Sequence, residues 1–165
     1  MKVFAFFTAT LCASAISLSL AASAAVASCA MPSDVDAMRH DVIALVNIER
    51  RKHGLKALSV SPKLQKAAQG HACDIAAQQS YSHVSSDGSD LRVRLKRVGY
   101  RLRTAAENTG RGFSSAEGMV DFWMHSPHHR DNILNNRIRE IGMGQAYTTS
   151  AGGKRHWVLN FGLSR

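Results

Sequence analysis

The sequence has few acidic residues and little proline. Its 165 residues include 12 Asp and Glu against 21 Lys and Arg, which gives a formal net charge of +9 at pH 7. Only 3 Pro and 12 Gly are present, so low-complexity linkers are excluded, and the length excludes a multidomain enzyme. Glutamate occurs at four positions, so any chemistry that needs this residue must use one of them: Glu49, Glu107, Glu117 and Glu140.

Common catalytic motifs are also missing. The chain has no G-x-S-x-G, no H-E-x-x-H, no P-loop and no C-x-x-C, which excludes the usual templates of hydrolases, metalloproteases and redox proteins. Histidine is the informative residue type, because eight are present and three crowd the short segment 125–129.

The N-terminal segment has the pattern of a secretory signal peptide. Residues 3–27 carry no charge, Lys2 precedes them, and Ala25-Val26-Ala27 forms an A-x-A site with cleavage before Ser28. Two alternatives remain: an uncleaved membrane anchor, or a lipobox that places a lipid on Cys29. Cleavage leaves Cys29 and Cys73, which we expect to form a disulfide in an oxidising compartment. The disulfide and the lipid require the same sulfur.

Local signals divide the remaining chain into helices followed by strands. We expect helices over 33–53, from 61 to about 76, over 91–98 and over 115–125, with Ser61-Pro62 starting the second and Gly54 and Gly99 ending two of them. We expect strands over 105–109, 140–149 and 155–162, the last two joined by a turn at Ser150–Gly153. This order predicts an α+β fold in which helices cover an antiparallel sheet.

Three residues are candidates for a shared site. If the fold brings His83, Glu107 and His129 together, two imidazoles can hold a divalent cation beside a carboxylate. The alternative is a buried polar network that ties loops to the sheet, and spacing does not decide between them. His71 falls on the apolar face of its predicted helix, which indicates a core histidine.

A basic run extends from Arg92 to Arg103 without an acid. It is either a solvated helix face or a surface that attracts anionic envelope polymers or lipid headgroups. Nucleic acid is not expected as a partner, because no aromatic stacking platform accompanies the arginines. The arginines of this surface are Arg92, Arg94, Arg97, Arg101 and Arg103.

An ordered set of motifs resembles the CAP superfamily, also called SCP domains, in its compact bacterial form. The superfamily includes cysteine-rich secretory proteins, antigen 5 and pathogenesis-related 1 proteins. The resemblance rests on LVNIER at 45–50, SHVSSDGS at 82–89, EN at 107–108, WMHSPHHRDNIL at 123–134 and IGMG at 141–144. Together with the signal-peptide pattern, this resemblance divides the chain into a signal peptide over 1–27, an N-terminal segment over 28–41 that includes the start of the first helix, and the CAP domain over 42–165.

The resemblance implies a three-layer α–β–α sandwich with a central antiparallel sheet. It also implies a cleft with two histidines and acidic residues, which holds zinc in some family members. By motif, the histidines are His83 and His129 and the first acid is Glu107. Ser126 stands where many eukaryotic members carry a second glutamate, and His128 replaces a glycine of the family motif, so both are expected in the cleft with His83, Glu107 and His129.

Three functions are compatible with these residues. The first is an exported binding module for a lipid, sterol-like or cell-envelope ligand, in the periplasm or outside the cell. The second is a metal-dependent hydrolase of peptide or cell-wall material, with a water activated by His83, His129 and Glu107. Glu117 and Asp121 are the candidates to substitute for the missing second acid. The third is a structural or interaction domain. We favour binding, because these residues provide no complete nucleophile–base pair and no closed metal set.

Overall fold

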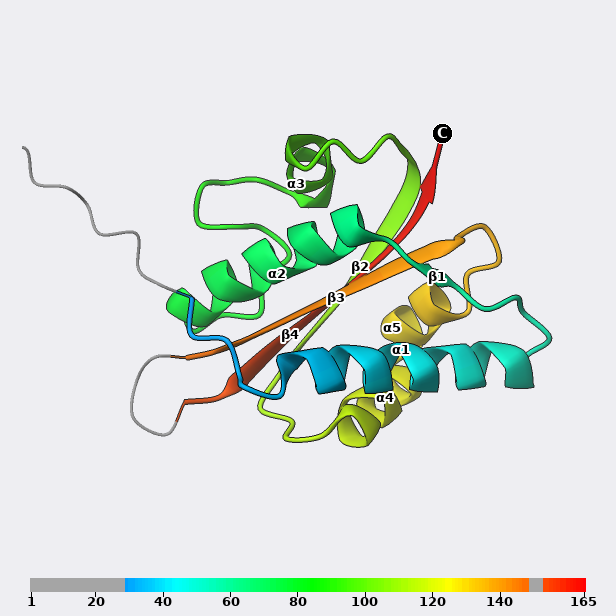
Figure 1. Cartoon of the computed structure of the whole chain (residues 1–165), viewed down its shortest axis with the longest axis horizontal. Coiled ribbons are helices and arrows are strands. Elements are labelled where there is room, and N and C mark those ends of the chain that lie inside the picture. The colour runs from blue at the N-terminus through cyan, green and yellow to red at the C-terminus, as the bar shows by residue number, and fades with distance from the viewer. Residues whose placement is uncertain (1–28, 149–152) are drawn as a thin grey trace, which may run out of the picture.

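The computed structural model describes residues 29–148 and 153–165, in which five helices and four strands are found. The predicted signal peptide lies outside the described residues, as does most of the predicted turn at Ser150–Gly153. The elements in chain order (Figure 1) are α1 (Val35–Lys52), β1 (Ser59–Val60), α2 (Pro62–Ala77), α3 (Leu91–Arg97), β2 (Leu102–Arg111), α4 (Ala116–His125), α5 (Pro127–Ile133), β3 (Glu140–Tyr147) and β4 (Arg155–Ser164).

Helix ends follow the local signals in the sequence. Ser61 caps α2 by accepting a hydrogen bond from the backbone N–H of Leu64, and Pro62 occupies the first turn. Asp90 caps α3 in the same way through Val93. Gly54 follows α1 in the left-handed region with φ of 69°, a conformation that costs glycine little. The predicted helices are therefore confirmed to within a few residues.

Two elements were not predicted. Helix α5 begins directly after α4, with Ser126 at its N-cap and Pro127 in its first turn. Strand β1 has two residues and pairs in parallel with β3, Ser59 lying opposite Glu140. Both elements are short, and β1 forms only because the tertiary structure places it beside β3.

The sheet has the strand order β1-β3-β4-β2. The three long strands are antiparallel, and β2 pairs with β4 alone, which makes β2 an edge strand over its whole length. The predicted α+β class and the antiparallel pairing of the long strands are confirmed, and the parallel pairing of β1 is an addition to them.

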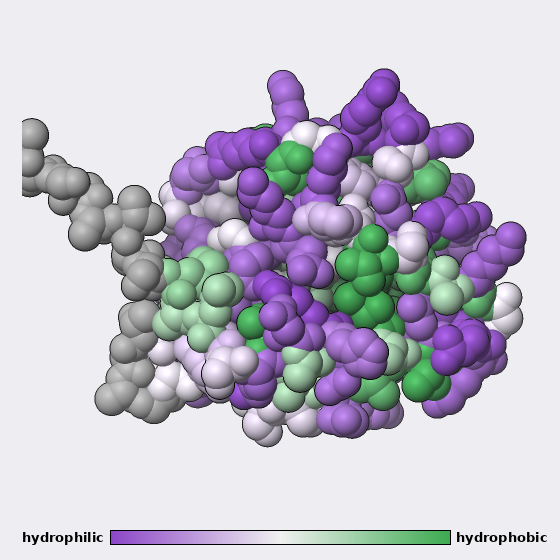
Figure 2. Space-filling model, in the orientation of Figure 1, coloured by the Kyte–Doolittle hydropathy of each residue, from purple (hydrophilic) through white to green (hydrophobic). Residues whose placement is uncertain are grey.

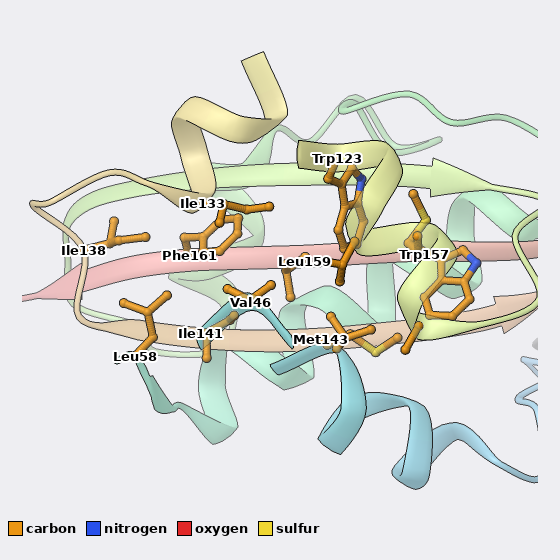
Figure 3. Close-up of a cluster of buried hydrophobic side chains, with 14 residues drawn as sticks. Val46, Leu58, Trp123, Ile133, Ile138, Ile141, Met143, Trp157, Leu159 and Phe161 are labelled. Carbon is orange, nitrogen blue, oxygen red and sulfur yellow. The ribbon is translucent and has the colours of Figure 1, made fainter. Parts of the chain in front are cut away.

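Helices cover both faces of the sheet and form the predicted three layers. Figure 1 shows α2 and α3 on one side of the strands and α1, α4 and α5 on the other. The larger core lies on the α1 side, where two tryptophans and Phe161 are fully buried among aliphatic side chains (Figure 3). On the outer surface that carries α1 and α2, hydrophilic residues predominate and hydrophobic ones form smaller patches (Figure 2).

Small residues let α2 lie close to the sheet. Because side chains alternate along a strand, Gly142 and Gly144 of β3 face α2, while Met143 faces the opposite core. A Cβ atom at Gly142 would come within 3.0 Å of the backbone of Leu64 and Gln65. Glycine is therefore required at this position for the observed packing of the helix.

The N-terminal end of the described chain is fixed to the sheet and to α2. The predicted disulfide between Cys29 and Cys73 is present, with the two Cα atoms 5.2 Å apart. The backbone N–H of Tyr147 donates to the carbonyl of Ala30 at 2.7 Å. None of the helices in the described part of the chain is long and apolar enough to cross a membrane.

Because α2 lies so close to β3, a single methyl group added at their contact should destabilise the fold strongly. Gly142→Ala should lower the free energy of unfolding by about 2–3 kcal/mol, because the helix must move away from the strand. Urea unfolding measures this change. Gly70→Ala is the matched control, since Gly70 lies in α2 where an added Cβ would meet no neighbouring atom, and it should raise stability by about 0.5–1 kcal/mol. Equal stabilities for the two variants would contradict the close packing.

Candidate functional site

The site is built on two neighbouring residues of the edge strand β2, Glu107 and Asn108. Successive side chains of a strand point to opposite faces. Glu107 therefore contacts groups of α2 and α3, whereas Asn108 contacts α5. Each of the two side chains positions one histidine, so His83 and His129 approach the edge of the sheet from opposite sides.

Glu107 forms the centre of a buried charge network. Its Oε2 accepts a hydrogen bond from Arg94 Nη2 at 2.7 Å, and its Oε1 accepts one from His83 Nδ1 at 2.9 Å. The side chains of Glu107 and Arg94 are only 3% and 7% exposed, while that of His83 is 57% exposed. His71 lies on the same side, with Nε2 3.7 Å from Oε1 of Glu107. The carboxylate thus orients His83, whose Nε2 is left for other partners.

The same network holds the loop that carries His83. Arg94 Nη1 donates to the carbonyl oxygens of His83 and Ser89, at 3.0 and 2.9 Å. The Thr109 hydroxyl of β2 donates to the carbonyl of Tyr81 at 3.1 Å. The predicted core histidine, His71, is buried and contacts Ser82 O and Ser85 Oγ. The predicted network that ties loops to the sheet is therefore present.

His129 is held by an amide pair and a hydroxyl group. Asn108 Nδ2 donates to the backbone carbonyl of His129 at 3.0 Å, and Asn132 Nδ2 donates to Asn108 Oδ1 at 2.9 Å. The Nδ1 of His129 is hydrogen-bonded to Ser126 Oγ at 2.9 Å. Ser126 therefore positions His129 on one wall as Glu107 positions His83 on the other.

A cleft of about 890 Å³ opens between the two histidines. Three aromatic residues line it, and two of them are among the most exposed large apolar side chains: Tyr81 at 67% and Phe122 at 42%. The ring of Phe122 lies 5.1 Å from that of Phe113 and 5.8 Å from that of His129. The lining consists of Tyr81, Ser82, His83, Thr109, Gly110, Arg111, Phe113, Phe122, His129 and Lys154.

The aromatic wall was missed in the sequence. Tyr81 lies two residues before His83, and Phe122 precedes the buried Trp123, so both were next to residues already singled out. Phe122 falls on the outer face of α4, outside the buried stripe that contains Met119 and Trp123, and this position off the apolar stripe is the signal that the sequence offers.

Other predicted site residues lie elsewhere. His128 is exposed and does not line the cleft. Asp121 lies 3.3 Å from His125, and both side chains are exposed. Glu117 lies in the first turn of α4 and lines none of the described hollows. Neither Asp121 nor Glu117 replaces the missing acid.

The predicted basic surface needs one correction. Arg94 is 6% exposed and bound to Glu107, so it belongs to the interior, because the buried carboxylate needs a buried cation. Arg97 is exposed and forms an ion pair with Asp87. Arg92, Arg101 and Arg103 are exposed, as predicted for that surface.

The described residues do not fit a closed zinc site. Both carboxylate oxygens of Glu107 are already occupied, by His83 and Arg94. Across residues 29–148 and 153–165, no three His, Cys, Asp or Glu side chains are grouped to hold a metal. His83 and His129 are thus two possible ligands, fewer than the three protein ligands of catalytic zinc centres.

Burial lowers the pKa of three histidines. Desolvation is the main cause for His71, His129 and His156, since it disfavours the charged ring. The nearby rings of His83 and His128 lower the pKa of His129 further. His129 is therefore held neutral at pH 7, with a ring nitrogen able to accept a hydrogen bond.

The sequence matches the model of the cysteine-rich secretory protein family, CAP, over residues 43–161. The Bacillus subtilis protein YkwD is 36% identical over 113 residues, which cover 68% of this chain and 44% of YkwD. The Bacillus subtilis membrane protein YlbC is 30% identical over 103 residues, which cover 62% of this chain and 30% of YlbC. The chain thus spans less than half the length of these relatives.

Solved structures have the same fold. An extracellular protein of Bacillus anthracis containing an SCP domain superposes with a TM-score of 0.70 at 26% identity, covering 78% of this chain and 41% of that one. An outer surface protein of Borrelia burgdorferi superposes with a TM-score of 0.74 at 18% identity, covering 84% of this chain and all of that one. At this identity the second likeness concerns the fold alone.

Because the ion pair between Glu107 and Arg94 is buried, removing its negative charge should reduce the stability of the fold strongly. Glu107→Gln should lower the free energy of unfolding by about 3 kcal/mol, because Arg94 stays buried without a countercharge. Denaturant unfolding at pH 7 measures the change. The matched control is Glu49→Gln, which breaks a more exposed pair with Lys52 and should cost less than about 1 kcal/mol. Equal losses of unfolding free energy in the two variants would show that the buried pair stabilises the fold no more than the exposed pair does.

Stability should fall when the medium becomes acidic. The lowered pKa values of His71, His129 and His156 mean that the unfolded chain binds more protons below the ordinary histidine value of 6.5. The three histidines contribute fully to the free energy of unfolding above pH 6.5. This contribution is lost as the pH falls from 6.5 toward their lowered pKa values in the folded state, by up to about 1.4 kcal/mol per pH unit for each group. Urea unfolding between about pH 8 and pH 5 tests this. His71→Gln should reduce the slope, and an unchanged slope would contradict the assignment.

Proposed function

Because the chain belongs to the cysteine-rich secretory protein (CAP) family, we propose that it is an exported binding module whose cleft takes a lipid-like ligand. The observation that supports this best is the cleft of about 890 Å³, whose wall leaves Tyr81 and Phe122 exposed. Ligand pockets are typically concave, mostly apolar and of about 300–1,000 Å³.

The aromatic wall favours an apolar ligand body. Phe113 and Phe122 stack against each other and leave apolar surface in contact with water. Covering such surface is favourable by about 25 cal/mol per Å². A hydrocarbon chain or fused-ring body would bury this wall.

Polar groups at the edge of the cleft favour a polar or anionic end on the same ligand. In both His83 and His129, the Nδ1 atom makes the hydrogen bond that orients the ring, and the Nε2 atom takes no part in that contact. Arg111 and Lys154 line the same cleft, and neither has a carboxylate within ion-pair distance among the described residues. An amphipathic anion, such as a fatty acid, suits this combination.

We favour binding over metal-dependent hydrolysis, because the described residues supply two imidazoles and no third metal ligand. The proposed function therefore uses no metal. Export is supported by the disulfide at Cys29, since such bonds persist in oxidising compartments, and by the extracellular relative from Bacillus anthracis. The disulfide uses the sulfur that a lipid anchor would need.

A fluorescent fatty acid, anthroyloxy-stearate, tests the cleft. Phe122→Ala should weaken binding about tenfold, because burial of one aromatic ring is lost. Fluorescence titration measures the Kd. Ile48→Ala is the control, since Ile48 is about as exposed but lies on α1 away from the cleft, and its Kd should match the wild type. Unchanged binding in a folded Phe122→Ala protein, or no binding by the wild type, would sink the proposal.

A further inference from the structure

Three hollows adjoin along the edge strand β2. The first is the cleft, and a second hollow of about 560 Å³ shares His83 with it. A third hollow, also of about 560 Å³, shares Arg103 and Thr104 with the second and extends to the segment 136–139 before β3. We call the whole run the β2 groove, since its lining follows this strand from Arg111 back to Leu102.

Unpaired cations line the β2 groove from end to end. Within residues 29–148 and 153–165, none of them has a carboxylate within ion-pair distance, although Arg94, Arg97 and Arg155 elsewhere do. The lining contains two acids: Glu107 is compensated by Arg94, and Asp90 keeps its negative charge while it caps α3, so the cations outnumber the uncompensated acid. The groove therefore carries a net positive charge from Arg92, Arg103, Arg111, Arg137, Arg139 and Lys154.

Local backbone features place the arginines at the third hollow. The pairing of β2 with β4 shifts between Leu102 and Thr104, so Arg103 is the extra residue of a β-bulge, a feature that redirects a side chain. Arg139 Nη1 donates to the carbonyl oxygens of Asn136 and Ile138, both at 2.7 Å. These bonds fix the guanidinium group while its other nitrogens stay available.

We propose that the β2 groove binds a linear polyanion that carries repeated phosphate or carboxylate groups and no bases. Arginine forks match these oxyanions in geometry and charge. The ten residues of β2 extend over about 33 Å, which is longer than a single headgroup. The cations lie in the walls of hollows, where a flexible chain reaches them more easily than a flat bilayer.

A nucleic acid is a poorer match for this groove. Single strands bind proteins through bases stacked on aromatic residues along the path of the strand. The second and third hollows have no Phe, Tyr or Trp in their described lining, and the Phe and Tyr residues of the groove lie in the cleft. A chain without bases uses the arginines and needs no stacking platform.

Long-chain inorganic polyphosphate is the probe, with pyrophosphate as the short comparison. We expect the full-length protein to bind the long chain, and to bind pyrophosphate at least about tenfold more weakly, because only a long chain contacts all the cations. The double variant Arg103→Gln, Arg137→Gln should bind the long chain about tenfold more weakly, with the salt slope reduced by about two. Both side chains are exposed and have no described side-chain hydrogen bond, so the fold should persist.

The matched control removes two charges outside the groove, by Arg51→Gln and Lys56→Gln, and should bind within about twofold of the wild type. If this control weakens binding as much as the groove variant does, only net charge matters and the proposal is wrong. Tighter binding to oligothymidylate, or binding to anionic vesicles without polyphosphate binding, would also overturn it. Anthroyloxy-stearate binding should be unchanged in the groove variant, so this proposal and that for the cleft can fail separately.

Discussion

The ion pair between Glu107 and Arg94 is the interaction on which the rest of the site depends. A carboxylate in the interior needs a countercharge, and Arg94 supplies it from α3. Once buried, the guanidinium group also binds the carbonyl oxygens of His83 and Ser89, which fixes the loop between α2 and α3. One electrostatic requirement therefore joins the edge of the sheet, a short helix and the loop that bears His83.

The alternation of side chains along β2 gives the site its two walls. Glu107 and Asn108 are neighbours in sequence but point to opposite faces of the sheet, and each positions one histidine. Ser126 and Glu107 perform the same orienting role with different chemistry. A hydroxyl group orients an imidazole without adding charge, and the one nearby carboxylate, Glu107, is already bound to His83 and Arg94, so the described residues supply no third metal ligand beside the two histidines.

Local chemistry made much of the fold predictable. Ser61 with Pro62, Asp90, and the glycines after α1 and α3 act over a few residues, so the sequence alone reveals them. The same Ser-Pro signal at Ser126 and Pro127 starts α5, a helix of seven residues that is short enough to give no apolar periodicity of its own. Strand β1 has no such signal, since two residues become a strand only when β3 lies beside them.

The family, four of the five helices, the disulfide partners and the residues His83, Glu107 and His129 can be read from local patterns in the sequence. What these residues do depends on the groups that folding places around them. Arg94 looked like a member of an exposed basic run, because charge along a sequence does not show which side chain turns inward to meet a carboxylate. The aromatic wall of the cleft and the line of cations along β2 come from segments far apart in the chain, which only folding brings together.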